Sequence, residues 1–338
     1  MRPFVYERAE DAAAAVRLAT RPTREPPTRA PAQFLAGGTN IVDYMRLGVA
    51  RPETLVDLNG LQAEHGRIEV GPEGLRLGAL ARMADVADHP AVARDYPVIA
   101  QALQASAGAQ IRNMAALGGN VLQRTRCQYF RDVGWKACNK REPGSGCAAM
   151  GGVNRKHAVL GASDHCIATY AGDFGQALAA LDAWVETLGP RGPRRIRFED
   201  LHRPPGDTPH IETVLEPGEL ITAFVVPAGP WTRRSLYLKI RDRQSFEFAL
   251  ASAAVALELE GDVVRQVRIA LGGVATRPWR AHEAEAVLLG RPLTPEAARA
   301  AAEAAFAPAV THGANDFKPE LGRRTLVRAL LQAADIKA

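Results

Sequence analysis

Phe34-Leu35-Ala36-Gly37-Gly38-Thr39-Asn40 is the stretch that decides the fold of the first half of this chain. Residues 33–36 read as a short strand and residues 40–47 as a helix, so glycines and polar residues fill the turn between them. Glycines let a ligand approach the backbone closely, and the Thr39 hydroxyl and the Asn40 amide add hydrogen-bond donors. The stretch predicts a phosphate or pyrophosphate site, and a tight turn that binds nothing is the alternative.

A second run of small residues, 105–120, ends in Leu117-Gly118-Gly119-Asn120. Gly-Gly-Asn inside a helix or a strand would be costly, so we expect another loop here. Two such loops in one domain could embrace a single dinucleotide, whereas a chance origin of both is the alternative.

All four cysteines follow directly, with the spacing C-x10-C-x8-C-x18-C: Cys127, Cys138, Cys147 and Cys166. The segment that contains them has no clean period of 2 or 3.6 and reads as a long ordered loop. Four thiols match the ligand count of a [4Fe–4S] cluster or an all-cysteine zinc site, but the paired cysteines typical of structural zinc sites are missing. A cluster is the preferred interpretation, and zinc or free or disulfide-bonded cysteines stay open. His157 and His165 are expected near the ligands rather than as ligands.

Composition places the chain among globular proteins. It has 338 residues, 47% of them hydrophobic and 23% charged, with a formal net charge of +5. No apolar run reaches the length of a membrane span, and the first residues lack the pattern of a signal peptide, so we expect folding in a reducing cytoplasm. Basic residues are scattered among acids, and nucleic-acid binding is therefore not expected.

The order of expected elements indicates two domains. Helices and strands alternate up to residue 226, and Pro227-Ala228-Gly229-Pro230 is the clearest boundary, because neither a helix nor a strand continues through it. Beyond the boundary a small antiparallel sheet precedes three helices, an α+β pattern. The expected strands and helices of this second part are residues 236–240, 249–260, 263–271, 280–288, 294–305 and 321–337.

Two further positions carry polar groups that could meet a flavin nucleotide. Ser163-Asp164 could bind a ribityl or ribose hydroxyl, or else cap the following segment. Lys239 ends an apolar strand on the same face as Tyr237 and could bind a flavin ring atom, while a solvent-facing strand end is the alternative.

Taken together, the two glycine stretches, Ser163-Asp164, Tyr237-x-Lys239 and the cysteine segment resemble the FAD-binding subunit of the molybdenum hydroxylases, the xanthine dehydrogenase family. The cysteine insertion resembles the branch of three-subunit bacterial aldehyde oxidoreductases whose medium subunit also carries a [4Fe–4S] cluster. The resemblance implies an α+β chain. Residues 1–226 would form a two-subdomain FAD-binding domain of the vanillyl-alcohol-oxidase type with a [4Fe–4S] insertion at about 121–168. Residues 231–338 would form a small α+β flavoprotein C-terminal domain.

The resemblance also implies roles for individual residues. The first stretch would cradle the pyrophosphate, the second would supply another phosphate contact, Asp164 would hold the ribityl side and Lys239 would approach the isoalloxazine. Cys127, Cys138, Cys147 and Cys166 would ligate the cluster. The implied FAD-binding residues are Leu35, Ala36, Gly37, Gly38, Thr39, Asn40, Ile41, Ala107, Asn113, Ala116, Leu117, Gly118, Gly119, Asn120, Asp164, Ile221 and Lys239.

A molybdenum-cofactor site, its catalytic glutamate and a [2Fe–2S] domain have no counterpart in this sequence. The resemblance assigns them to a large and a small partner subunit in a heterotrimer, with this chain passing electrons through FAD to an external acceptor. A xanthine or N-heterocycle dehydrogenase subunit, an autonomous flavin oxidase and a zinc-stapled assembly module are the alternatives. The complex would be cytoplasmic, or periplasmic if a signal-bearing partner exports it.

Overall fold

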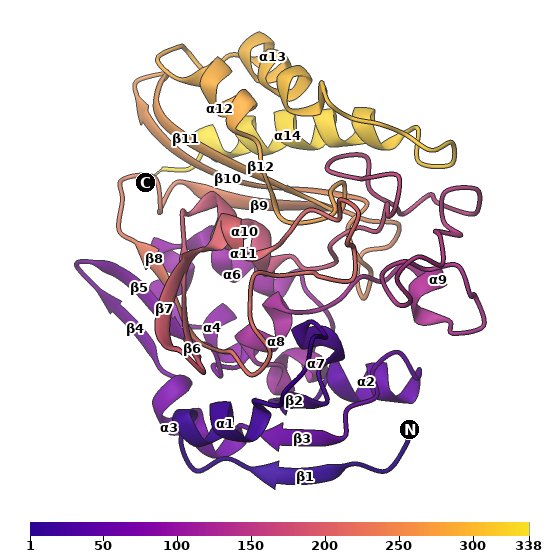
Figure 1. The fold of residues 1–338 in the computed structure, drawn as a ribbon. Helices are drawn as coiled ribbons and strands as arrows, with labels where there is room; N and C mark the ends of the chain where they lie inside the picture. The colour runs from indigo at the N-terminus through magenta and orange to yellow at the C-terminus, as the bar shows by residue number, and fades with distance from the viewer. Residues whose placement is uncertain (338) are drawn as a thin grey trace.

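A computed structural model describes residues 1–337. The strands of the chain form three separate β-sheets (Figure 1). None of the helices within these residues is long and apolar enough to cross a membrane.

The first sheet is parallel and has three strands in the order β1-β3-β2. It consists of β1 (Val5–Arg8), β3 (Thr54–Asp57) and β2 (Ala32–Leu35), joined by α1 (Ala12–Ala19) and α2 (Ile41–Arg46). All four residues of β3 are buried, as expected for the central strand of a parallel sheet. The sheet thus brings the end of β2, and the glycines after it, to the start of α2.

The second sheet is antiparallel, with five strands in the order β4-β5-β8-β6-β7. Two hairpins flank the central strand β8, so residues far apart in sequence share one sheet. Its strands are β4 (Ile68–Gly71), β5 (Gly74–Gly78), β6 (Trp184–Gly189), β7 (Gly192–Arg197) and β8 (Leu220–Pro227).

Short helices pack around this sheet and enclose the largest hydrophobic core. Val98, Ile99, Leu103, Phe174 and Phe224 lie within it, almost completely shielded from solvent. These helices are α4 (Met83–Ala87), α5 (Pro90–Asp95), α6 (Pro97–Gln104), α7 (Ala109–Met114), α8 (Leu117–Val121), α10 (Phe174–Ala180) and α11 (Phe198–Leu201). The remaining short turns of this half are η1 (Pro27–Arg29), η2 (Asn59–Leu61) and α3 (Gln62–His65).

The third sheet is antiparallel, in the order β12-β11-β10-β9, and begins after the Pro227-to-Pro230 stretch. Helices α12 to α14 cover its outer face, while α6 and α10 lie against the other (Figure 1). In β10, Ala253 and Val255 join the outer core and Ala254 and Ala256 join the inner one. A strand buried on both faces explains its continuous apolar run. The elements are β9 (Ser235–Ile240), β10 (Ala251–Glu260), β11 (Val263–Gly272), β12 (Trp279–Arg280), α12 (His282–Leu288), α13 (Pro295–Phe306) and α14 (Lys318–Ala334).

The cysteine segment lies between α8 and α10 and contains one short helix, α9 (Gln128–Arg131). Its far end is joined to the third sheet, because the Val159 and Leu160 amides both donate to the Val274 carbonyl, at 2.8 and 3.0 Å. Figure 1 shows the loops around α9 at one side of the molecule. The expectation of a long ordered loop is confirmed.

Two expectations of secondary structure were wrong. The Gly118-Gly119-Asn120 stretch is not a loop but part of α8, where a β-carbon on Gly118 would lie only 3.3 Å from Ala79. The close packing of this helix against Ala79, just after β5, favours glycine here and outweighs the low helix propensity of this residue. The Ala-rich pattern of residues 7–18 indicates one amphipathic helix, but the helix begins only at Ala12, and Val5–Arg8 form β1, whose exposed side chains give no alternating pattern.

Candidate functional site

A cavity lies where the glycine stretch after β2 meets α8. Most of the predicted phosphate-binding residues line it, together with Tyr44 from α2 and apolar residues from β8. The predicted residues that line the cavity are Ala36, Gly37, Gly38, Thr39, Asn40, Ile41, Ala116, Gly118, Gly119 and Ile221.

Direct contacts hold the two glycine stretches together. The Asn40 amide donates from Nδ2 to the Gly119 carbonyl at 2.9 Å. A β-carbon on Gly37 would overlap the carbonyl of Met114, just before α8. Gly38 has a φ of +75°, a left-handed backbone that glycine adopts at little cost. The two stretches therefore form one continuous wall.

Part of this wall is open for a ligand. A β-carbon on Gly119 would meet no atom of residues 1–337 within 4 Å. Two buried polar atoms at the cavity, Thr28 Oγ1 and His202 Nε2, find no hydrogen-bond partner within the same residues. Bare backbone beside unpartnered polar atoms fits a nucleotide cofactor such as FAD.

The remaining predicted residues lie outside the cavity lining. Leu117 and Asn120 are buried behind it, and Leu35 is half-buried. Ala107, in a left-handed conformation with φ of +49°, and Asn113 are exposed on either end of α7.

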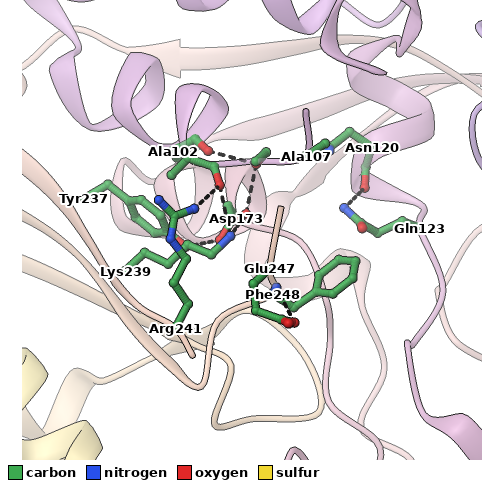
Figure 2. A network of polar contacts seen from close by, with 12 residues as sticks. Ala102, Ala107, Asn120, Gln123, Asp173, Tyr237, Lys239, Arg241, Glu247 and Phe248 are labelled. Carbon is green, nitrogen blue, oxygen red and sulfur yellow. Dashed lines mark hydrogen bonds and ion pairs between the residues drawn. The ribbon is translucent and has the colours of Figure 1, made fainter. Parts of the chain in front are cut away.

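Lys239 belongs to a buried polar network beyond the cavity lining (Figure 2). Its ammonium group donates to Asp173 Oδ2 at 2.8 Å and to the Ala105 carbonyl at 3.0 Å. Asp173 also accepts from the Tyr237 hydroxyl at 2.6 Å and the Ser106 hydroxyl at 3.0 Å. Burial and the neighbouring carboxylate raise the pKa of Tyr237 well above its usual range. Lys239 is therefore a buried, paired cation and not a solvent-facing strand end.

Sequence reasoning did not identify Asp173 as a functional residue. The structure places Asp173 beside Lys239, whereas Asp164 is exposed and lies outside the cavity lining. The available signal was a lone acid in an apolar run, Tyr170-Ala-Gly-Asp173-Phe174, where a buried carboxylate needs a cationic partner.

A second charged group lines the cavity itself and includes residues of the cysteine segment. Arg124 Nε donates to Glu212 Oε1 at 2.7 Å, and Lys140 Nζ lies 3.7 Å from the same oxygen. Burial alone would raise the pKa of Glu212, but Arg124 and Lys140 hold it below its usual value. Burial lowers the pKa of the nearby His202 to about 4, so its imidazole is neutral. These charged residues were not predicted, since Glu212 lies far from Arg124 in sequence.

The four cysteines are gathered in one region and none forms a disulfide within the described chain. Cys138 and Cys147 face each other in a β-bridge, and Cys166 is buried and lines the cavity. Burial raises the pKa of the Cys127 thiol to about 12, with Cys138 and Cys166 near enough to raise it further. A metal would therefore have to displace protons from these thiols on binding.

The expected metal-ligand set is not formed as such. In the described part of the chain, no three His, Cys, Asp or Glu side chains are grouped so that they could hold a metal ion. His157 Nε2 lies 3.2 Å from Cys127 Sγ, and burial lowers the pKa of this histidine to about 4. His165 is exposed.

Two protein-family models together match nearly the whole chain. Residues 2–229 match the FAD binding domain in molybdopterin dehydrogenase, and residues 236–333 match the CO dehydrogenase flavoprotein C-terminal domain. The chain belongs to the FAD-binding subunits of molybdopterin dehydrogenases.

Individual relatives support this family assignment. The aldehyde oxidoreductase FAD-binding subunit PaoB of Escherichia coli is 46% identical, over 98% of this chain and 99% of that protein. The carbon monoxide dehydrogenase medium chain of Afipia carboxidovorans is 29% identical, over 98% and 96%. A chain in the structure of carbon monoxide dehydrogenase from Hydrogenophaga pseudoflava superposes with a TM-score of 0.75 at 27% identity, covering 98% of each chain. The expected fold, an FAD-binding domain followed by a flavoprotein C-terminal domain, is confirmed. This FAD-binding chain is a subunit of an oxidoreductase of the molybdenum hydroxylase type.

Proposed function

We propose that this chain is the FAD- and [4Fe–4S]-containing electron-transfer subunit of a heterotrimeric, molybdenum-dependent aldehyde oxidoreductase. One observation carries the proposal: the chain combines the FAD cavity with a four-cysteine segment that lines it, and it is 46% identical to an aldehyde oxidoreductase FAD-binding subunit. A large subunit with the molybdenum cofactor would oxidise the aldehyde. A small [2Fe–2S] subunit would deliver the electrons to this chain, which passes them to an external acceptor.

FAD, when bound, supplies the exchange between one-electron and two-electron transfer. The chain's own residues bind and orient it. Gly119 would leave room for the phosphates, Gly37 lets the stretch pack closely against the Met114 carbonyl, Gly38 provides the left-handed turn, and Thr39 would add a hydroxyl donor. By the resemblance, Lys239 would serve the isoalloxazine end, and its ammonium group is held by Asp173 outside the cavity lining.

The donor chemistry of the cysteine segment supports an iron–sulfur cluster. A single zinc would draw four thiolates to about 2.3 Å from one point, and the closely paired cysteines typical of structural zinc sites are missing from the sequence. A [4Fe–4S] cluster spreads the same four ligands around a larger body. Cys138 and Cys147 share one β-bridge, Cys166 lines the FAD cavity and Cys127 lies near Cys138 and Cys166, so the four thiols come from one region, although they would have to move to enclose a cluster. Lys140, near Cys166, would offset part of the thiolate charge.

The absorption spectrum of the purified protein tests both cofactors. We expect flavin bands on a broad iron–sulfur shoulder, with iron and FAD in the ratio of one cluster to one flavin. Flavin bands alone would leave an FAD subunit or an autonomous oxidase and would remove the cluster. Absence of both would refute the whole proposal.

Coexpression with molybdenum and [2Fe–2S] subunits tests the assembly and the substrate. A stable three-chain complex should reduce an artificial acceptor with aldehydes and not with xanthine or other N-heterocycles. Turnover of N-heterocycles alone would assign the chain instead to a complex like that of the nicotine 6-hydroxylase medium subunit, which is 29% identical.

A further inference from the structure

Arg126 joins the cysteine segment to the glycine stretch that lines the FAD cavity. Its guanidinium donates from Nη2 to Asn40 Oδ1 at 3.0 Å and from Nη1 to the Tyr44 hydroxyl at 3.3 Å. It also lies 5.3 Å from the centroid of the Phe248 ring. The residue that follows Arg126 is Cys127. A single side chain therefore contacts the end of the glycine stretch, α2 and the loop after β9.

These contacts determine how the Asn40 amide is oriented. Because Arg126 has only donors, it fixes Oδ1 of Asn40 toward itself and turns Nδ2 toward the Gly119 carbonyl. Without Arg126, the amide could rotate, and the hydrogen bond between the two glycine stretches would no longer be enforced. The charged donor makes this the stronger of the two hydrogen bonds.

We propose that Arg126 is a positioning residue for FAD, through which the conformation of the cysteine segment controls the closure of the FAD cavity. The inference rests on the FAD-binding role proposed above and is independent of which metal, if any, the cysteines bind. Any shift of Cys127 moves Arg126, which in turn releases Asn40 from Gly119. By reciprocity, bound FAD then favours the same conformation of the cysteine segment.

Arg131, the last residue of α9, provides a control. It forms a two-pronged contact with Asp43 of α2, at 2.8 and 3.2 Å, and comes from the same segment. Arg131→Gln therefore removes a similar tie between the segment and α2 while leaving the Asn40 amide in place.

FAD titration of the apoprotein, followed by flavin fluorescence, tests the proposal. We expect Arg126→Gln to raise the FAD dissociation constant about tenfold, the effect of one hydrogen bond to a charged group, and Arg131→Gln to change it less than about twofold. Asn40→Ala should also weaken binding. The Arg126→Gln/Asn40→Ala double variant should bind FAD no more weakly than the weaker-binding single variant, because both substitutions remove the same interaction.

Three results separate the possible failures. Wild-type protein that binds no FAD refutes the proposed function itself. Wild-type affinity in Arg126→Gln, or full additivity in the double variant, overturns the role of Arg126 and leaves the FAD site intact. If Arg126→Gln does not fold, Arg126→Lys decides, because lysine keeps the charge but cannot place two donors in a fixed fork: a loss of affinity supports the proposal and wild-type affinity overturns it.

Discussion

The ammonium group of Lys239 and the carboxylate of Asp173 lie 2.8 Å apart. In the sequence, Asp173 precedes the stretch that links β8 to β9, and Lys239 follows it. Only about 5% of either side chain is exposed. The pair therefore ties the third sheet to the helices of the first half in a place where water cannot replace either partner.

Asp173→Asn should destabilise the apoprotein by about 3–5 kcal/mol, because it leaves the Lys239 ammonium buried without its counter-charge. Chemical denaturation measures the change. The exposed pair of Arg155 and Asp242 is the control, and Asp242→Asn should cost less than about 1 kcal/mol. Equal losses in the two variants would contradict the distinction between buried and exposed pairs.

Gly37 and Gly119 should respond in opposite ways to a methyl group. Gly37→Ala places its β-carbon against the Met114 carbonyl, so it should lower stability by about 1–3 kcal/mol and abolish FAD binding. Gly119 belongs to α8, and a methyl group added there points into open space. Because alanine favours a helix more than glycine does, Gly119→Ala should leave the stability of the apoprotein unchanged or raise it by up to about 1 kcal/mol. FAD affinity should fall, because the methyl group occupies the space that the cofactor needs. Thermal unfolding and FAD titration measure both. Undiminished FAD affinity in Gly119→Ala would show that the cofactor does not approach this wall.

Cys138→Ser should abolish the iron content of the purified chain. Cys138 is buried and faces Cys147 across the β-bridge, so a serine hydroxyl replaces one thiolate in the middle of the set. Iron analysis and the visible shoulder measure the loss, with flavin absorbance as the internal reference. Full iron content in this variant would remove Cys138 from the ligand assignment.

Because Lys318 is buried, we expect the stability of the apoprotein to depend on pH. Burial lowers its pKa from 10.5 to about 7 in the folded chain. Between these values the unfolded chain binds more protons than the folded chain, so stability rises with pH, by up to about 1.4 kcal/mol per pH unit. Below pH 7 both states are protonated and the contribution is constant.

Lys318→Met should remove this slope. Denaturation at about pH 7.5 and 9.5 compares the two proteins, and the difference in unfolding free energy between them should change across that interval. Parallel pH dependences would show that Lys318 does not titrate in this window.

The sequence was sufficient where local chemistry decides the structure. The strand, glycines and helix around Gly37 and Gly38 form as expected, because each residue suits its own backbone conformation. The α+β order of the third sheet and its helices also follows from local periodicity.

Partners distant in sequence could not be predicted in the same way. The placement of α8 depends on the packing of Gly118 against Ala79, and the charge on Glu212 depends on Arg124. Such contacts produce no periodic pattern of hydrophobic and polar residues in the sequence of either segment. The same holds for Asp173, whose importance is visible only when Lys239 lies beside it.

The way the cysteine segment is joined to α14 limits how the polypeptide can be dissected. Lys318 donates to the His157 carbonyl at 2.9 Å, and Asn315 donates to the Ala158 carbonyl at 3.1 Å. The clearest domain boundary in the sequence is at 227–230. If the chain were divided there and the halves produced separately, both carbonyls would lose their hydrogen-bond donors, and the inner face of β10 would become exposed to solvent. Each half is therefore expected to be insoluble when produced alone and to become soluble only when both halves are produced in the same cell. This two-domain flavoprotein is then a single unit of folding.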